Sequence, residues 1–105
     1  MNIKEISDSE LIHLIKEESE EAKDIIYEKY HYIIGIIIKK YLTAAKINNI
    51  EYNDLYQEAL LGFSDALNRY DENNSSLPTF ITLCVDLGGR RIINRKNSKR
   101  NKRKK

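Results

Sequence analysis

The feature that most constrains the fold is a row of apolar side chains that recur every three or four residues. This spacing places them on one helix face, so we expect a single long helix over residues 20–45 that forms the backbone of the fold. Residues 36–38 alone would also suit a buried strand, but the helical period continues on both sides and argues against one. The row comprises Ile25, Ile26, Tyr30, Ile33, Ile34, Ile37, Tyr41 and Leu42.

Serine residues mark where the first two helices should begin. Ser7 stands three residues before Glu10, which is the spacing of a capping box, and a short helix should follow and end near Glu18. Ser19 is then expected to cap the long helix, where Glu20 suits the positive end of the helix dipole.

Two more helices are expected in the second half of the chain. Asn53 or Asp54 should cap a helix that ends near Tyr70, and Pro78 stands where a last helix can begin without losing a needed N–H. The buried face of the third helix should consist of Leu55, Ala59, Phe63, Ala66, Leu67 and Tyr70.

We therefore predict an all-α fold, a small bundle of about four helices over residues 1–96 with a basic tail over residues 97–105. Gly88 and Gly89 should weaken the last helix by about 1 kcal/mol each, and the helix either continues beyond them or restarts after a bend. The tail contains no apolar residue, so we expect it to be disordered without a partner.

Charge is distributed very unevenly along the chain. Residues 1–89 carry sixteen acidic and eight basic side chains, whereas residues 90–105 carry ten basic and none acidic. This polarity suggests a polyanionic partner for the C-terminal end and a different partner for the body. A simple solvated basic terminus is the alternative.

Several function classes lack their sequence signals. Cys84 is the only cysteine, which is typical of a reducing, cytoplasmic setting, and no signal peptide is visible. His13 and His31 have no partners at metal-ligand spacing, and no phosphate-binding loop occurs, so we expect no cofactor and no metal. No nucleophile–base pair occurs either, so we expect no enzyme, and residues 33–38 are too short to span a bilayer.

Polar residues of the third expected helix recur on one face. Asp54, Gln57, Glu58 and Leu61 are spaced by three or four residues, beside the face that should be buried. Such a face suits docking on a basic helical partner, because complementary charge speeds encounter and sets register. An ordinary solvated face is the alternative.

An aromatic residue and a pair of arginines follow. Phe80 stands near the start of the last helix, where it either stacks on an unpaired base or fills the core. Arg90 and Arg91 open the basic end and would contact phosphates, or guanine in a major groove.

These residues resemble a known family. Residues 54–63, Asp-Leu-Tyr-Gln-Glu-Ala-Leu-Leu-Gly-Phe, followed by Ala66, Arg69, Tyr70 and Asp71, closely resemble the D-L-x-Q-E-G-x-x-G-L…A…K-F-D signature of region 2 of sigma-70 factors. Residues 77–80, Leu-Pro-Thr-Phe, look like the F-S-T-Y or F-x-x-F segment of that family, and residues 10–41 resemble its first helices. The resemblance covers residues 7–99.

The resemblance implies a bacterial transcription-initiation module that binds RNA polymerase and recognises and melts the promoter −10 element. Residues expected to contact the clamp helices of the polymerase β′ subunit are Asp54, Gln57, Glu58 and Leu61. Residues expected to engage promoter DNA, chiefly the non-template strand, are Arg69, Phe80, Leu83, Cys84, Leu87, Arg90, Arg91 and Arg95. Among them, Phe80 would stack on a flipped base. The resemblance also admits an anti-sigma factor or a second sigma subunit as a partner.

The chain departs from the family pattern at several positions. Housekeeping members carry a tryptophan pair where this chain has Leu83 and Cys84, and a polar residue near Leu87. These differences imply weaker melting or a different promoter preference. Two other functions compete with the resemblance: a generic basic helical protein that binds DNA or RNA through its tail, and a helical regulatory adaptor whose acidic face binds a partner.

Overall fold

The structure, a computed structural model, describes residues 6–71 and 75–103, and the side chains of that part up to residue 96. It holds five helices and no strand over these ranges, which confirms the all-α prediction. The helices are α1 (Asp8–Lys16), α2 (Glu20–Tyr30), α3 (Tyr32–Ile47), α4 (Tyr52–Arg69) and α5 (Leu77–Arg103).

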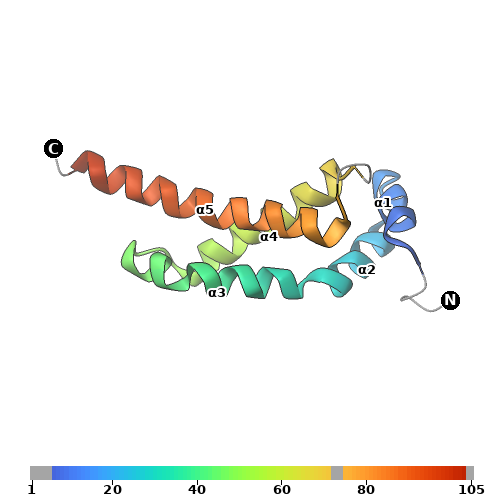
Figure 1. Ribbon diagram of the computed structural model, residues 1–105, viewed down its shortest axis with the longest axis horizontal. Coiled ribbons are helices and arrows are strands. Elements are labelled where there is room, and N and C mark those ends of the chain that lie inside the picture. The colour runs from blue at the N-terminus through green and yellow to red at the C-terminus, as the bar shows by residue number, and fades with distance from the viewer. Residues whose placement is uncertain (1–5, 72–74, 104–105) are drawn as a thin grey trace.

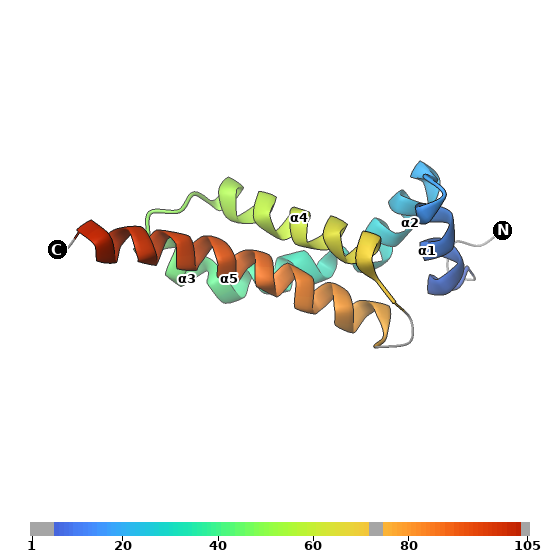
Figure 2. The same cartoon turned by 90° about the horizontal axis from the view of Figure 1, so that it is seen from above.

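The molecule is elongated, with extents of 58 × 23 × 21 Å. Helices α3, α4 and α5 lie side by side along its length, and α1 and α2 cover one end (Figures 1 and 2). The core between them is apolar, and Leu55 of α4 and Ile81 and Val85 of α5 are almost completely buried. Burial of such side chains contributes about 1.5–3 kcal/mol each. Leu11 of α1 and Ile26 of α2 are buried as completely, so all five helices share one core.

The expected long helix is in fact two helices, because the helical hydrogen-bond pattern is interrupted at His31. Its ring Nδ1 lies 3.2 Å from the carbonyls of Tyr27 and Glu28, and the amide of Ile34 donates to the carbonyl of His31, three residues back instead of four. A side chain that bonds to backbone carbonyls competes with the helical ladder and bends it. The prediction of one helix over residues 20–45 was therefore wrong, although the apolar face continues across the break.

Two of the predicted helix caps are confirmed and one is wrong. The Oγ of Ser7 accepts from the amide of Glu10, and the Oγ of Ser19 accepts from the amide of Ala22. Helix α4 begins at Tyr52 with Glu51 as its cap and no side-chain capping bond, so Asn53 and Asp54 lie inside the helix.

Helix α5 passes through Gly88 and Gly89 without interruption. A Cβ on Gly88 would lie 2.5 Å from the carbonyl oxygen of Glu58, and one on Gly62 would lie 2.5 Å from that of Cys84. The two glycines therefore let the backbones of α4 and α5 touch, and Gly89 makes similar room for the ring of Tyr41 on α3.

Beyond residue 96 the described backbone stays helical to Arg103, where the sequence predicted a disordered tail. No proline or glycine occurs between residues 97 and 103, so nothing in the local sequence ends the helix that α5 propagates. The predicted boundary between domain and tail does not coincide with a helix end.

Candidate functional site

The outer face of α4 presents most of the residues for which the family resemblance implies polymerase binding. Asp54 and Gln57 are exposed, and Leu61 is 63 % exposed although it is a large apolar residue. Their spacing on one helix places them in a row, while the opposite face of α4 packs into the core as predicted. Leu61 is not isolated, because it lines a groove with Leu60, Phe63 and Leu67, and a grouped apolar surface with a polar rim is typical of a protein-binding site.

Glu58 differs from the rest of this row. Its side chain is only 20 % exposed, and its Oε1 accepts from Nη2 of Arg95 at 2.6 Å. The sequence assigned Glu58 to the polymerase and Arg95 to DNA, yet the structure pairs them across α4 and α5. Sequence alone could not reveal this pair, because its members are 37 residues apart.

A groove between α2 and α4 adds residues that the sequence analysis did not single out. Asp24 and Tyr27 of α2 form one wall, and Gln57, Leu60 and Leu61 of α4 form the other. The acidic and aromatic residues of α2 thus extend the surface that begins on α4. In the sequence, the feature that could have indicated this surface is the helical spacing of Glu20, Asp24 and Tyr27, which places them on one face of α2.

Tyrosines tie the two walls of this groove together. The hydroxyl groups of Tyr27 and Tyr56 lie 3.1 Å apart, and this hydrogen bond, together with burial, raises the pKa of Tyr56. The ring of Tyr27 also stacks on His31 and meets Phe63 edge-on, with centroids 5.4 and 5.7 Å apart. The contacts of Tyr27 with Tyr56 and Phe63 join α2 to α4 across the groove, and the contact with His31 orders the end of α2.

On α5, the four predicted DNA-facing apolar residues are not equivalent. Leu83 is 55 % exposed and Leu87 is also exposed, whereas Cys84 is half-buried, and burial raises the pKa of its thiol. Phe80 is half-buried too, with its ring 5.8 Å from that of Tyr70. Phe80 therefore packs against the core, as one of its two predicted roles requires, and its stacking on a base stays a prediction.

The predicted polymerase and DNA residues meet in a second groove, between α4 and α5. Glu58, Leu61 and Arg69 line it from α4, and Cys84, Leu87 and Arg91 line it from α5. The two sets are therefore neighbours along the line where α4 meets α5.

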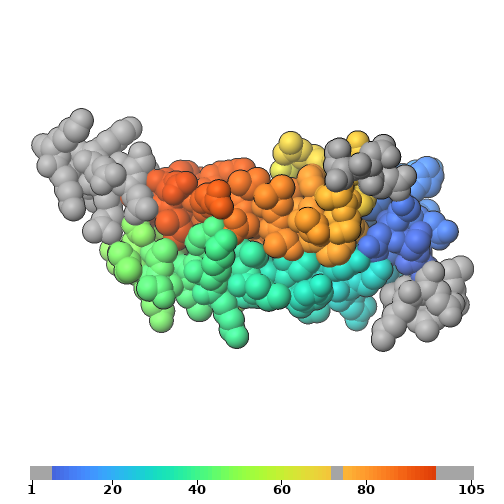
Figure 3. All heavy atoms as spheres, viewed as in Figure 1, coloured from blue at the N-terminus to red at the C-terminus, as the bar shows by residue number. Residues whose placement is uncertain are grey.

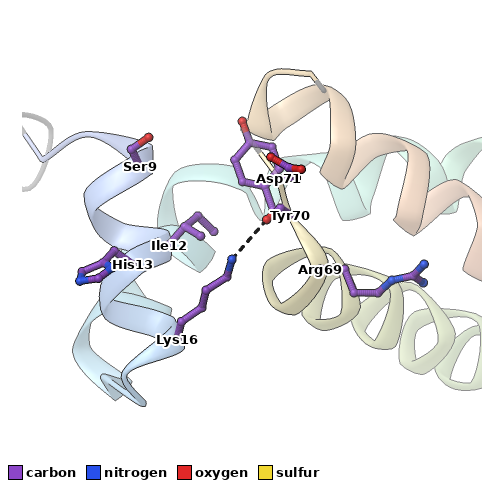
Figure 4. Close-up of a pocket in the computed structure, with 7 residues that line it drawn as sticks. All are labelled: Ser9, Ile12, His13, Lys16, Arg69, Tyr70 and Asp71. Atoms are coloured by element: carbon purple, nitrogen blue, oxygen red, sulfur yellow. Dashed lines mark hydrogen bonds between the residues drawn. The ribbon is translucent and has the colours of Figure 1, made fainter. Parts of the chain in front are cut away.

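Arg69 stands at the end of α4, where it pairs with Asp65 at 3.5 Å, and both side chains are exposed. Its guanidinium extends away from the hollow between α1 and α4, in which Lys16 Nζ donates to the carbonyl of Tyr70 (Figure 4). The position of Arg69 leaves it open to a partner that approaches the flank of α4.

A buried acid, Asp86, was not among the residues predicted from the sequence. Its Oδ1 accepts from Lys40 Nζ at 2.8 Å and from the Tyr41 hydroxyl at 2.9 Å, and its Oδ2 accepts from Arg90 Nη2 at 3.1 Å. Burial of the carboxyl opposes ionisation, but these bonds and the charges of Lys40 and Arg90 outweigh it and hold the pKa of Asp86 below its usual range. This cluster joins α3 to α5 and orients the predicted DNA residue Arg90.

A family model described as Sigma-70 region 2 matches residues 26–102, which is most of the chain and includes α3, α4 and nearly all of α5. Helix α1 lies outside the match. Neither the curated proteins nor the solved structures gave a match. Among the described residues, no helix is long and apolar enough to cross a membrane.

Proposed function

Because the chain belongs to the sigma-70 region 2 family, we propose that it docks on the β′ clamp helices of RNA polymerase and captures the opened −10 strand of promoter DNA. Domains of this family act in transcription initiation, with roles in polymerase binding and promoter recognition, and they are not enzymes. We assign the first role to the outer face of α4 and the second to the exposed side of α5.

The observation that carries the docking proposal is the exposure of Leu61 at the end of the polar, acidic row formed by Asp54, Gln57 and Glu58. In this proposal Leu61 fills an apolar gap between the clamp helices, and Gln57 and Asp54 bond to their polar side chains. Asp24 across the groove adds negative charge on the same side, which favours a basic partner. Glu58 joins the contact only by exchanging its partner Arg95 for a polymerase residue.

The DNA half of the proposal places unpaired bases along α5. Leu83 and Leu87 offer apolar surface to the edge of the melted strand, with Cys84 behind them in the groove. Phe80 stacks on a flipped base with the part of its ring that Tyr70 leaves uncovered. Arg90, Arg91, Arg95 and Arg69 contact phosphates.

Clamp binding tests the first half. Leu61→Ala should weaken binding of the full chain to a fragment that carries the β′ clamp helices by at least about tenfold, as expected for truncation of a central apolar anchor. Leu14→Ala, which truncates another exposed leucine, on α1, is the matched control and should change the affinity less than about twofold. Equal affinities for the two variants would refute docking through α4.

A comparison of single-stranded with double-stranded DNA tests the proposed DNA binding. It also distinguishes this function from that of a generic basic DNA-binding protein. The chain should prefer a single-stranded oligonucleotide to the same sequence as a duplex, and Leu83→Ala should reduce that preference. Leu83 is the sharper choice than Phe80, because Phe80→Ala would also disturb packing against Tyr70. Equal affinity for duplex and single strand would instead favour nonspecific binding through the basic end.

A further inference from the structure

Helices α3 and α5 lie in contact on the face seen in Figure 3, and α4, which carries the acidic row, lies behind them (Figures 1 and 2). Helix α3 has no acidic residue and carries Lys39, Lys40 and Lys46. Helix α5 carries one acid, Asp86, among many bases. Lys40 of α3 and Arg90 of α5 are exposed cations that meet at Asp86, so positive charge on this face comes from two helices that are far apart in the sequence.

Asp86 holds one cation from each of these helices. Lys40 bonds to Oδ1 and Arg90 to Oδ2, so the two cations are fixed on the two oxygens of one buried carboxylate. The cations themselves are open to solvent, because their side chains are 55 % and 58 % exposed. One negative charge thus organises two positive charges, and the cluster keeps a net positive charge at the surface.

We propose that Lys40 and Arg90 form one phosphate-binding site for the DNA backbone, with Asp86 as the positioning residue between them. This inference rests on the DNA-binding half of the proposed function and extends that surface from α5 onto α3. An ammonium has three N–H donors and a guanidinium five, so each cation can hold Asp86 and a phosphate oxygen together. Contacts of this kind fix the position of the duplex or strand and carry no sequence preference.

The buried carboxylate explains why the two cations stand so close. Without it, Lys40 and Arg90 would repel each other across α3 and α5, and their long side chains would lose conformational freedom on binding DNA. Asp86, ionised because its pKa is low, removes the repulsion and orders both side chains in advance. The hydroxyl of Tyr41 also donates a hydrogen bond to Asp86, and this third partner of the carboxylate is uncharged.

The salt dependence of DNA binding tests the site. For a 20-base-pair duplex of arbitrary sequence, the slope of log Kd against log salt should fall in magnitude by about one in Lys40→Gln. Lys40→Arg keeps the charge and should keep the slope. Lys23→Gln is the matched control, because Lys23 is also paired with an acid, Glu20, but lies on α2.

A slope that is the same in Lys40→Gln and in the unmodified chain would overturn the site. A second measurement needs no substitution and so does not depend on how a variant folds. Bound duplex should protect Lys40, and not Lys23, from an amine-reactive reagent, and equal labelling of Lys40 with and without DNA would overturn the site as well. Clamp binding is measured separately, so docking on α4 can fail while this site stands, and the reverse also holds.

Discussion

The side of the bundle built by α2 and α4 and the side built by α3 and α5 hold their charges in different ways. Helices α2 and α4 contain seven acidic residues, most of them on the surface, and α3 and α5 contain one, which is buried. On the first side the acids surround exposed apolar groups such as Leu61. On the second side the acid lies underneath and orders Lys40 and Arg90. In our proposals, this difference lets one small bundle offer a protein-docking surface and a phosphate-binding surface at once.

The two sides meet where α4 crosses α5. We therefore expect the largest loss of stability from a substitution of Gly88, which lies at this crossing. Gly88→Ala places a Cβ 2.5 Å from the Glu58 carbonyl oxygen, and the helix backbones must separate to make room. We expect the free energy of unfolding to fall by about 2–3 kcal/mol in urea titrations.

Gly35→Ala is the control for that substitution, because nothing lies within 4 Å of a Cβ at Gly35 on α3. It should raise stability by up to about 1 kcal/mol through better helix propensity. Equal effects at the two glycines would show that α4 and α5 are not in such close contact.

A smaller loss of stability is expected from a substitution of Asp86, whose hydrogen bonds join α3 to α5. Asp86→Asn should lower the free energy of unfolding by about 1–3 kcal/mol at neutral pH, because Lys40, Tyr41 and Arg90 lose a charged acceptor.

The same variant has a pH signature. The folded pKa of Asp86 is lowered, so its stabilising contribution is present above the unfolded pKa of about 3.9 and is lost as pH falls through the lower folded value. Thermal denaturation from pH 6 down to pH 2 should show that Asp86→Asn approaches the unmodified chain at the acid end. A constant difference across that range would contradict a stabilising, ionised Asp86.

The smallest change in stability is expected from loss of the ion pair between Glu58 of α4 and Arg95 of α5, which bridges the two sides. Glu58→Gln should change stability by less than about 1 kcal/mol, because Arg95 is well exposed and solvent screens its pairing with the carboxylate. The measurement is the midpoint of urea unfolding, with Asp65→Asn, which removes the partner of Arg69, as the control. A loss as large as that of Gly88→Ala would mean that the pair, and not the glycine contact, joins α4 to α5.

Local patterns in the sequence were enough to predict much of the fold. The serine caps at Ser7 and Ser19 and the buried face of α4 depend on residues three or four apart, and both predictions were confirmed. The break at His31 was not predictable in this way, because the apolar period runs through it and only the ring bonds to the carbonyls reveal it.

For the candidate site, too, the sequence predicted the features that depend on residues three or four apart. Asp54, Gln57 and Leu61 share an exposed face because helical spacing alone puts them there. The partner of Glu58, the role of Gly88 and the Asp86 cluster depend on which helices touch, and residues 30 to 46 positions apart give no local sign of that. Tertiary contacts therefore decided which predicted residues are open to a partner.

The central claim is that the two sides serve two partners, and one crossed measurement tests it most directly. Binding to the β′ clamp fragment and to a single-stranded oligonucleotide is measured for Gln57→Ala/Leu61→Ala and for Leu83→Ala/Arg91→Gln. We predict that the first variant loses at least about tenfold in clamp affinity with DNA binding nearly unchanged, and that the second shows the reverse. Loss of both activities in both variants, or of neither, would contradict the claim.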